Sequence, residues 1–244
     1  MTATARPGFR ANLTALQSAQ KPSRGTAAYS RHVNRPLGRL VAAWMHARGL
    51  TPNQATAISA TLSGVAIALL CLVRPSWWLG VTVAVLLAAG YVMDSVDGQL
   101  ARLRGRGSVS GEWLDHTVDC FKTLTLHLAV LISWYRFVNL PSPGWLLVPI
   151  GFTIVAAATY FGLILMPTLR PASTTSAPPT DEHPLRRFLI LPVDYGFLCW
   201  VFVLLGWPEG FRIVWTLLLA AAAAMLALAL VKWWRELRLI DGIA

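Results

Sequence analysis

Four aspartates stand within 26 positions of one another, at the ends of two apolar segments. Asp94 and Asp97 are three residues apart, and Asp115 and Asp119 are four residues apart. Side chains at these spacings share one face of an α-helix. If both segments are helical, the short connection between them turns the two pairs toward each other. We therefore expect the four carboxylates to converge.

Carboxylates that converge near an apolar boundary repel one another and resist ionisation. A divalent cation removes this conflict, and oxygen ligands alone favour Mg²⁺, with Mn²⁺ and Ca²⁺ as further options. The alternative is a solvated cluster in which the acids pair with Arg102, Arg104 and Arg106. Because that alternative leaves the shared helical faces unexplained, the pattern predicts a metal site.

Two glycines and an arginine accompany the acids. Gly98 follows Asp97 directly, Gly111 stands one turn before Asp115, and Arg102 lies one turn beyond Gly98. Glycine in a helix costs about 1 kcal/mol relative to alanine, which makes sense where a large ligand must approach the backbone. Arg102 could pair with a phosphate of that ligand. Ordinary helix packing would explain either glycine alone, but beside the acids a ligand pocket is the better interpretation.

The segments that position the acids have the composition of membrane helices. The 244 residues are 55% hydrophobic and only 13% charged, too little charge to cover a soluble domain. A membrane-spanning helix needs about 20 apolar residues. Six stretches qualify, at roughly 54–73, 77–97, 114–135, 145–166, 188–206 and 211–231. We expect an all-α, polytopic membrane protein whose acids end the second span and begin the third.

A basic leader precedes the spans. Residues 1–27 lack the apolar segment of a signal peptide and are expected to be flexible. Between residues 31 and 48, apolar and basic side chains recur on separate helical faces, which is typical of an amphipathic helix on an anionic membrane surface. The expected organisation is a leader (1–27), a membrane domain (28–235) and a cytoplasmic tail (236–244).

The basic residues also orient the chain. With a cytoplasmic N-terminus, seventeen Lys and Arg residues fall on the cytoplasmic side and three on the other, which places both termini and the acids on the cytoplasmic side. In a bacterium this membrane would be the plasma membrane. The net charge of +10 then reflects attraction to the membrane surface, and no nucleic-acid partner is expected. The three cysteines are scattered through different spans and are interpreted as packing residues.

The acids and glycines form a recognisable motif. The pattern Asp-x-x-Asp-Gly-x-x-Ala-Arg, eight residues, then Gly-x-x-x-Asp-x-x-x-Asp, is typical of the CDP-alcohol phosphotransferases. This chain matches it without departure at Asp94, Asp97, Gly98, Ala101, Arg102, Gly111, Asp115 and Asp119. It resembles that family over about residues 28–231, six spans included.

The resemblance implies a reaction in which a CDP-linked donor passes a phosphate-bearing group to an alcohol and releases CMP. It implies Mg²⁺ or Mn²⁺ as cofactor, with two ions expected, and a homodimer in the lipid bilayer. The implied metal ligands are Asp94, Asp97, Asp115 and Asp119, of which Asp119 is also the proposed general base. The implied nucleotide-binding residues are Asn53, Thr56, Gly98, Arg102, Ser108 and Gly111.

Polar residues outside the motif are candidates for binding the acceptor alcohol. Lys122 lies one turn beyond Asp119 and would either hold an acceptor phosphate or balance the acids. Arg187 is expected at the cytoplasmic mouth of the fifth span, and Asp194 about two turns into it. His116 and His127 are interpreted as packing residues. A phosphorylated polyol such as inositol phosphate or glycerol phosphate, with CDP-diacylglycerol as donor, is the leading prediction; neutral acceptors and soluble CDP-alcohol donors stay open.

Two other classes of protein use carboxylates in membranes. Intramembrane prenyltransferases also bind diphosphates through metal ions, but they place their acidic motifs on well-separated helices. A divalent-metal transporter would carry its acids near the bilayer midplane. Here the four aspartates belong to one helical hairpin at the membrane edge, which favours the phosphotransferase.

Overall fold

The structure, a computed structural model, describes residues 8–18, 28–105, 107–171 and 194–242. These residues form helices and include no strand, which confirms the predicted all-α class. In chain order the elements are α1 (Phe9–Ser18), the π-helical turn η1 (Ser30–Asn34), α2 (Arg35–Ala47), α3 (Pro52–Leu72), α4 (Trp77–Leu103), α5 (Val109–Phe137), η2 (Pro143–Leu146), α6 (Leu147–Leu169), α8 (Tyr195–Val201), η5 (Phe202–Gly206) and α9 (Pro208–Ile240).

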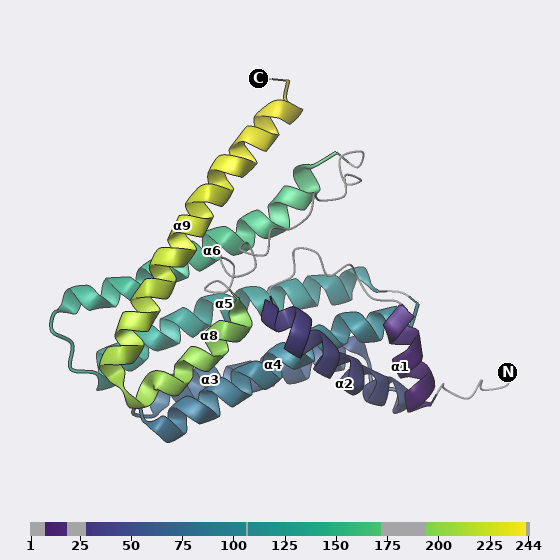
Figure 1. The fold of residues 1–244 in the computed structure, drawn as a ribbon, viewed down its shortest axis with the longest axis horizontal. Helices are drawn as coiled ribbons and strands as arrows, with labels where there is room; N and C mark the ends of the chain where they lie inside the picture. The colour runs from purple at the N-terminus through teal and green to yellow at the C-terminus, as the bar shows by residue number, and fades with distance from the viewer. Residues whose placement is uncertain (1–7, 19–27, 106, 172–193, 243–244) are drawn as a thin grey trace.

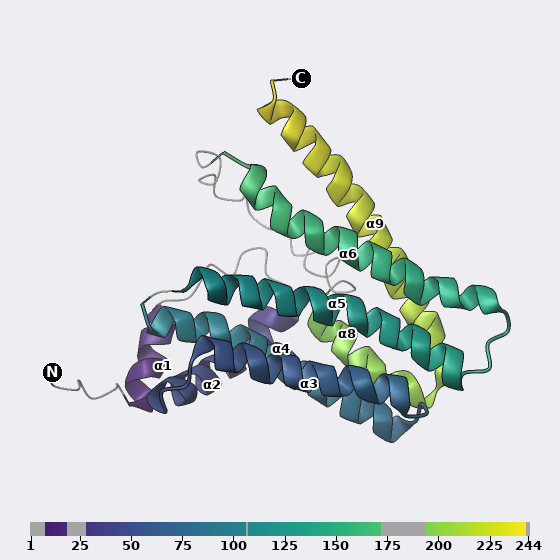
Figure 2. The same cartoon turned by 180° about the vertical axis from the view of Figure 1, so that it is seen from behind.

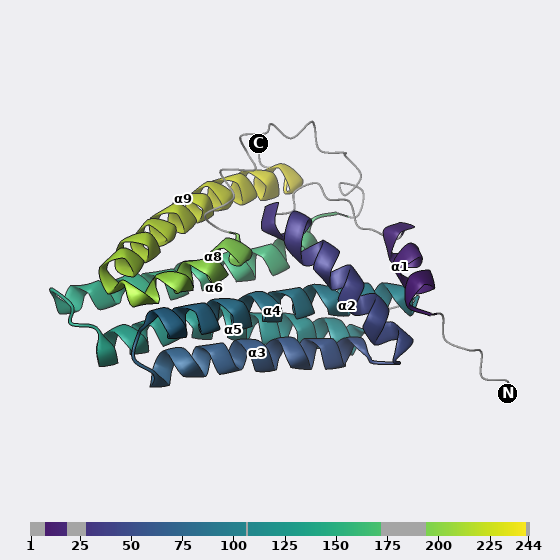
Figure 3. The ribbon, with the colours of Figure 1, turned by 60° about the horizontal axis from the view of Figure 1, so that its bottom comes forward.

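Three long helices, α3, α4 and α5, lie side by side and form the body of the molecule (Figure 1). Helix α3 packs against both of the others, while α8 and η5 pack against α4. On the other side α6 packs on α5 and α9 on α6, and the far ends of α6 and α9 extend away from the body (Figure 2). Helix α2 crosses α4 obliquely (Figure 3).

Local sequence determines where the three central helices begin. Thr51 and Gln54 form a capping box in front of α3, and Pro52 occupies its first turn. The Ser76 side chain accepts a hydrogen bond from the third residue of α4, and Ser108 caps α5 in the same way. Helix α4 continues beyond the predicted end at residue 97 to Leu103, so the first acid pair lies within the helix.

Four described helices are long and apolar enough to cross a membrane: Pro52–Leu72, Trp77–Leu103, Pro143–Leu169 and Pro208–Ile240. Two of the six predicted spans lack this support. Helix α5 has ample length, but its first half carries Glu112, Asp115, Asp119 and Lys122, which lower its apolar character. The fifth predicted span begins among residues outside the described ranges, and its described part, Tyr195–Gly206, is short.

The main core lies at one end of the helical body. Four aromatic side chains are almost completely buried and pack on one another with edge-to-face or tilted rings: Trp134 of α5, Phe202 of η5, and Phe211 and Trp215 of α9. They pack against the first half of α4, from Leu79 to Ala88. The acids occupy the last part of α4 and the first part of α5. The site and the aromatic core are therefore at opposite ends.

The leader that was expected to be flexible contains an ordered helix. In α1, Leu16 is fully buried and Asn12 is 2% exposed, and the Asn12 side chain donates a hydrogen bond of 3.2 Å to the carbonyl oxygen of Ala43 in α2. Asn12 and Leu16 are four residues apart and present one face to α2. Because that face combines one polar and one apolar side chain, hydrophobic periodicity did not predict the helix.

The close approach of α4 to η5 requires glycine at position 80. A Cβ on Gly80 would lie 2.5 Å from the carbonyl oxygen of Phe202 and 2.9 Å from that of Val203, and backbone atoms cannot easily move away. We expect Gly80→Ala to destabilise the fold by about 1–3 kcal/mol, visible as a lower melting temperature of the purified protein in detergent. Gly64→Ala is the matched control, because a Cβ there meets no atom within 4 Å. Equal melting temperatures for the two variants would contradict this packing.

Candidate active site

A tight connection between α4 and α5 turns the acid pairs toward each other. Gly105 adopts a φ of 74°, the left-handed conformation that suits glycine at a helix end, and its N–H donates to the carbonyl oxygen of Arg102. The Arg104 guanidinium donates to the carbonyl oxygens of Gly49 and Leu50, at 3.1 and 2.9 Å. These contacts join the connection to the turn before α3.

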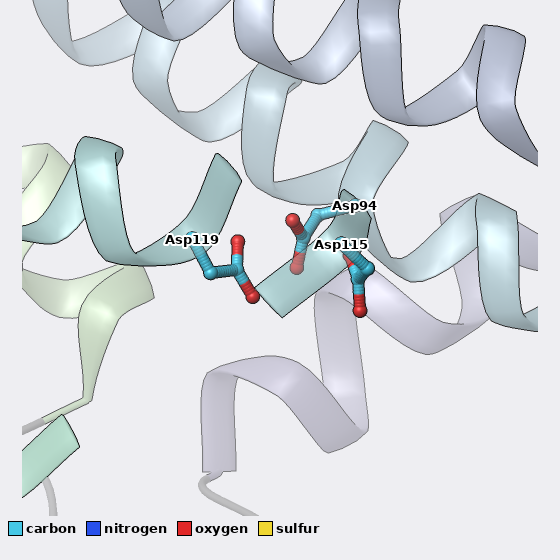
Figure 4. Close-up of side chains that lie close together, drawn as sticks. All are labelled: Asp94, Asp115 and Asp119. Atoms are coloured by element: carbon cyan, nitrogen blue, oxygen red, sulfur yellow. The ribbon is translucent and has the colours of Figure 1, made fainter. Parts of the chain in front are cut away.

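Three of the four predicted metal ligands converge. Asp94 of α4 and Asp115 and Asp119 of α5 each offer a carboxylate oxygen, and these oxygens lie within 4.8 Å of one another. Figure 4 shows the three side chains extending from two helices toward a common space. All three are partly buried, so their charges are poorly hydrated. The spacing argument from the sequence therefore describes these three side chains correctly.

The fourth acid, Asp97, is turned toward α3. One of its carboxylate oxygens accepts a hydrogen bond of 2.8 Å from the Thr56 hydroxyl, and the other accepts one of 2.5 Å from the N–H of Gly98. The side chain is 8% exposed. Asp97 still lies close enough to Asp115 for their charges to interact. It completes the acidic cluster, but it is held by Thr56, which the sequence assigned to the nucleotide.

Lys122 lies among the acids. Its Nζ is 2.5 Å from Asp94 Oδ1 and 2.6 Å from Asp119 Oδ1, and it donates to Ser59 Oγ at 3.3 Å. Of the two roles considered from the sequence, these contacts favour the balancing of acid charge over the binding of an acceptor phosphate.

The donor set fits a hard divalent cation. Every converging ligand is a carboxylate oxygen, which Mg²⁺ and Mn²⁺ prefer. Asp115 Oδ1 is buried, and no hydrogen-bond partner for it exists among the residues that the structure describes. A buried carboxylate oxygen without a donor is costly, and a bound cation would satisfy it.

The two motif glycines serve different purposes. A Cβ on Gly98 would meet only the Arg102 guanidinium, at 3.8 Å, so the backbone there is open to a ligand. The Nε of Arg102 is buried and lacks a hydrogen-bond partner within the described ranges. At Gly111, by contrast, a Cβ would lie 2.8 Å from Ser108 Oγ and 3.3 Å from Asn53 Oδ1. Gly111 lets α5 begin next to α3, and this brings Asn53 and Ser108 together.

The remaining candidates lie elsewhere or have partners. Arg187 belongs to residues 172–193, which fall outside the described ranges. Asp194 is at the N-terminus of α8 instead of two turns into a helix, and its carboxylate accepts from the N–H groups of Gly196 and Tyr29 at 3.0 and 2.9 Å. His127 stacks on Phe152 with ring centroids 4.1 Å apart, the packing role expected of it.

Sequence reasoning singled out Thr56 but missed the polar stripe on α3 to which it belongs. Thr56, Ser59 and Ser63 are each at most 3% exposed and recur at helical spacing within an apolar span. Ser59 donates to the carbonyl oxygen of Gly90 at 2.8 Å and accepts from Lys122. Polar residues at such spacing in a membrane helix face a polar interior, and this signal was available in the sequence. Tyr195, whose buried hydroxyl has no partner among the described residues, carried no comparable signal.

Comparison with known proteins assigns the fold and the motif to one family. The profile of the CDP-alcohol phosphatidyltransferases matches residues 49–234, most of the chain and the whole acidic cluster. The chain belongs to this family. It is therefore a CDP-alcohol phosphotransferase, a membrane enzyme of phospholipid biosynthesis. A comparison with curated proteins gives no sequence match.

Two solved structures with the same fold are of one protein. The phosphatidylinositol phosphate synthase PgsA1 of Mycobacterium tuberculosis with CDP-DAG bound aligns with a TM-score of 0.55 and 20% identity, over 83% of this chain and 94% of that chain. The same protein in complex with manganese and citrate gives 0.51 and 22%, over 83% and 89%. At these identities the likeness concerns the fold.

Thr56 offers a test of how the acidic cluster is positioned. Thr56→Val removes the hydrogen bond to Asp97, and losing a bond to a charged group costs about 1.5–3 kcal/mol. We expect CMP release to fall roughly 10- to 100-fold. Thr61→Val is the matched control, because the Thr61 hydroxyl donates only to the carbonyl oxygen of Ala57 on the same exposed helical face. Similar rates for both variants would show that Thr56 does not position Asp97.

Proposed function

We propose that this enzyme transfers the phosphatidyl group of CDP-diacylglycerol to a small polar alcohol and releases CMP. The observation that carries the proposal is the convergence of Asp94, Asp115 and Asp119 beside the open backbone of Gly98 and the unpartnered Nε of Arg102. Carboxylates can hold a cation, while an open helix face and a guanidinium can receive a phosphate. The two features together suit a nucleotide diphosphate.

Asp94 and Asp115 would hold the divalent ion, Mg²⁺ or Mn²⁺, with Asp119 beside it. Asp97, fixed by the hydrogen bonds that it accepts from Thr56 and Gly98, would support them. When bound, the ion neutralises the charge that builds up on the diphosphate as CMP leaves. Arg102 would pair with a phosphate oxygen. Asn53 and Ser108, brought together at the start of α5, would contact the nucleotide from the side of α3.

Asp119 is the proposed general base. Its side chain is 29% exposed, against 21% for Asp94, so an incoming hydroxyl can reach it more easily. A general base must lie within hydrogen-bond reach of the proton that it takes. Asp119 would accept the proton of the acceptor alcohol as the alcohol oxygen attacks the phosphorus atom.

The lipid donor is supported by the fold likeness to PgsA1, whose crystals contain CDP-DAG in one case and manganese in another. For the acceptor we keep a phosphorylated polyol, inositol phosphate or glycerol phosphate, as the proposal. Arg187 remains a candidate for its phosphate. Asp194 and Lys122 are weaker candidates, because their charged groups already have protein partners.

The proposal also includes the arrangement of the chain in the membrane. We place residues 28–235 in one membrane domain with six spans, both termini in the cytoplasm, and the active site on the cytoplasmic side. The distribution of basic residues supports the orientation, and four apolar helices support several crossings. We also propose a homodimer, which the resemblance of the motif to this family implies.

Substrate specificity can be measured with purified enzyme in detergent. CDP-diacylglycerol with inositol phosphate or glycerol phosphate and Mg²⁺ is expected to release CMP, and EDTA is expected to stop the release. The matched reactions replace the donor by a soluble CDP-alcohol or the acceptor by inositol, glycerol or serine. CMP release that depends on a neutral acceptor would overturn the phosphorylated-polyol proposal. Full activity in metal-free buffer would overturn the metal site.

Asp119→Asn separates base chemistry from donor binding. The amide keeps the shape of the side chain but cannot accept the proton, so kcat is expected to fall by about 100-fold or more. The affinity for CDP-diacylglycerol, measured by equilibrium binding, should stay within a few-fold of the wild type. Asp94→Asn is the comparison, since it removes a metal ligand and should weaken donor binding as well. A parallel loss of affinity in both variants would make Asp119 chiefly a ligand.

A further inference from the structure

Lys122 occupies the space between two of the converging acids. Its Nζ contacts one oxygen of Asp94 at 2.5 Å and one of Asp119 at 2.6 Å, and Ser59 Oγ lies 3.3 Å away. The lysine side chain is only 12% exposed. These two carboxylates belong to different helices, so the ammonium group joins α5 to α4 as a bridging metal ion would.

A divalent ion that bridged the same two oxygens would have to sit beside the ammonium group or replace it. Two cations in contact in a poorly hydrated site repel each other strongly. Asp115 has a buried Oδ1 without a partner among the described residues, and the ion pairs of Lys122 there are with Asp94 and Asp119. Asp94 and Asp119 therefore already share a cation, the ammonium group of Lys122, whereas no group of the described residues satisfies Asp115 Oδ1.

The surroundings of Lys122 oppose its withdrawal. Its side chain lines a groove between α3 and α5 of about 160 Å³, whose other walls are Ala60, Gly64, Ile67, Val118, Phe121 and Thr125. Apart from the Thr125 hydroxyl, this lining is apolar. An ammonium group that moved into the groove would exchange two carboxylates for an apolar wall within a membrane protein, which is strongly unfavourable.

We propose that Lys122 is a built-in cation that takes the place of one metal ion between Asp94 and Asp119, so that this enzyme binds a single divalent ion instead of two. This inference rests on the metal site of the proposed function. The single ion would use Asp115 together with the oxygen of Asp94 that Lys122 leaves free, and Asp97 would support it. The oxygen of Asp119 that Lys122 leaves free would stay available to accept the proton of the acceptor alcohol. The lysine then contributes its positive charge to the site permanently.

The number of bound ions tests this proposal directly. Mn²⁺ is titrated into the purified full-length protein in detergent, and free Mn²⁺ is counted by its EPR signal. The wild type is expected to bind one Mn²⁺ per chain, and Lys122→Met, which keeps the length of the side chain without its charge, is expected to bind two. Two neighbouring Mn²⁺ ions would also broaden each other's EPR spectrum. Lys122→Arg should restore binding of a single ion.

Lys232→Met is the matched control, because it makes the same change at an exposed lysine of α9 and should leave one ion per chain. Two ions bound to the wild type, or one ion bound to Lys122→Met, would overturn the inference and leave the proposed function intact. No Mn²⁺ bound to any variant would overturn both. If Lys122→Met fails to fold, Lys122→Gln answers the same question, and the wild-type count alone can refute the proposal.

Discussion

The mutual repulsion of carboxylates that two helices bring together is the constraint on which the site depends. The four acids are stabilised in three different ways. Asp97 accepts hydrogen bonds from Thr56 and from the backbone of Gly98, while Asp94 and Asp119 share the ammonium group of Lys122. Asp115 keeps a buried oxygen without a partner in the described part of the chain. The unsatisfied charge gives the cluster its affinity for a cation, since each contact that is missing from the protein is available to an ion.

Helix α3 controls this arrangement, although it carries none of the acids. It packs against both α4 and α5, and its buried polar stripe reaches each of them. A Cβ on Gly90 of α4 would lie 2.6 Å from Ser63 Oγ, so the glycine permits close contact between the two helices. Thr56 orients Asp97, and Ser59 contacts Lys122. The acids are therefore held by a third helix as well as by the connection between α4 and α5.

The sequence predicts interactions between residues that are close together along the chain better than interactions between residues that are far apart. The convergence of Asp94, Asp115 and Asp119 depends on helical spacing and a short connection, both of which are local and readable. The direction of the Asp97 side chain depends on Thr56, 41 residues away, and the partners of Lys122 include Ser59, 63 residues away. Spacing along one helix contains no information about such contacts. For the same reason the sequence left two roles open for Lys122, whereas the structure shows which groups it contacts.

The same difference between local and distant contacts applies to the fold. Apolar runs predicted the long helices, but the helix α1 depends on its tertiary contacts with α2. Leu16 is buried by a neighbour 26 or more residues along the chain, in the cluster that includes Ala42 and Met45. A ten-residue helix without this contact would be marginal, so the expectation of a flexible leader was reasonable for the sequence and wrong for residues 9–18.

The separation of the aromatic core from the acids explains how a small membrane enzyme can combine rigidity with access. Trp134, Phe202, Phe211 and Trp215 close one end of the helical body, where almost no surface of these side chains is exposed. At the other end, α6 contacts α5 through the Tyr160 hydroxyl and the carbonyl oxygen of His116. Farther along, α6 diverges from the body and is joined to α9 by the ion pair of Arg170 and Glu236 (Figure 1). The aromatic core at one end fixes the helix axes, and a second apolar cluster, which includes Ala42, Val96 and Leu100, supports the acid end. The acids are therefore held in place while α6 and α9 extend away from them.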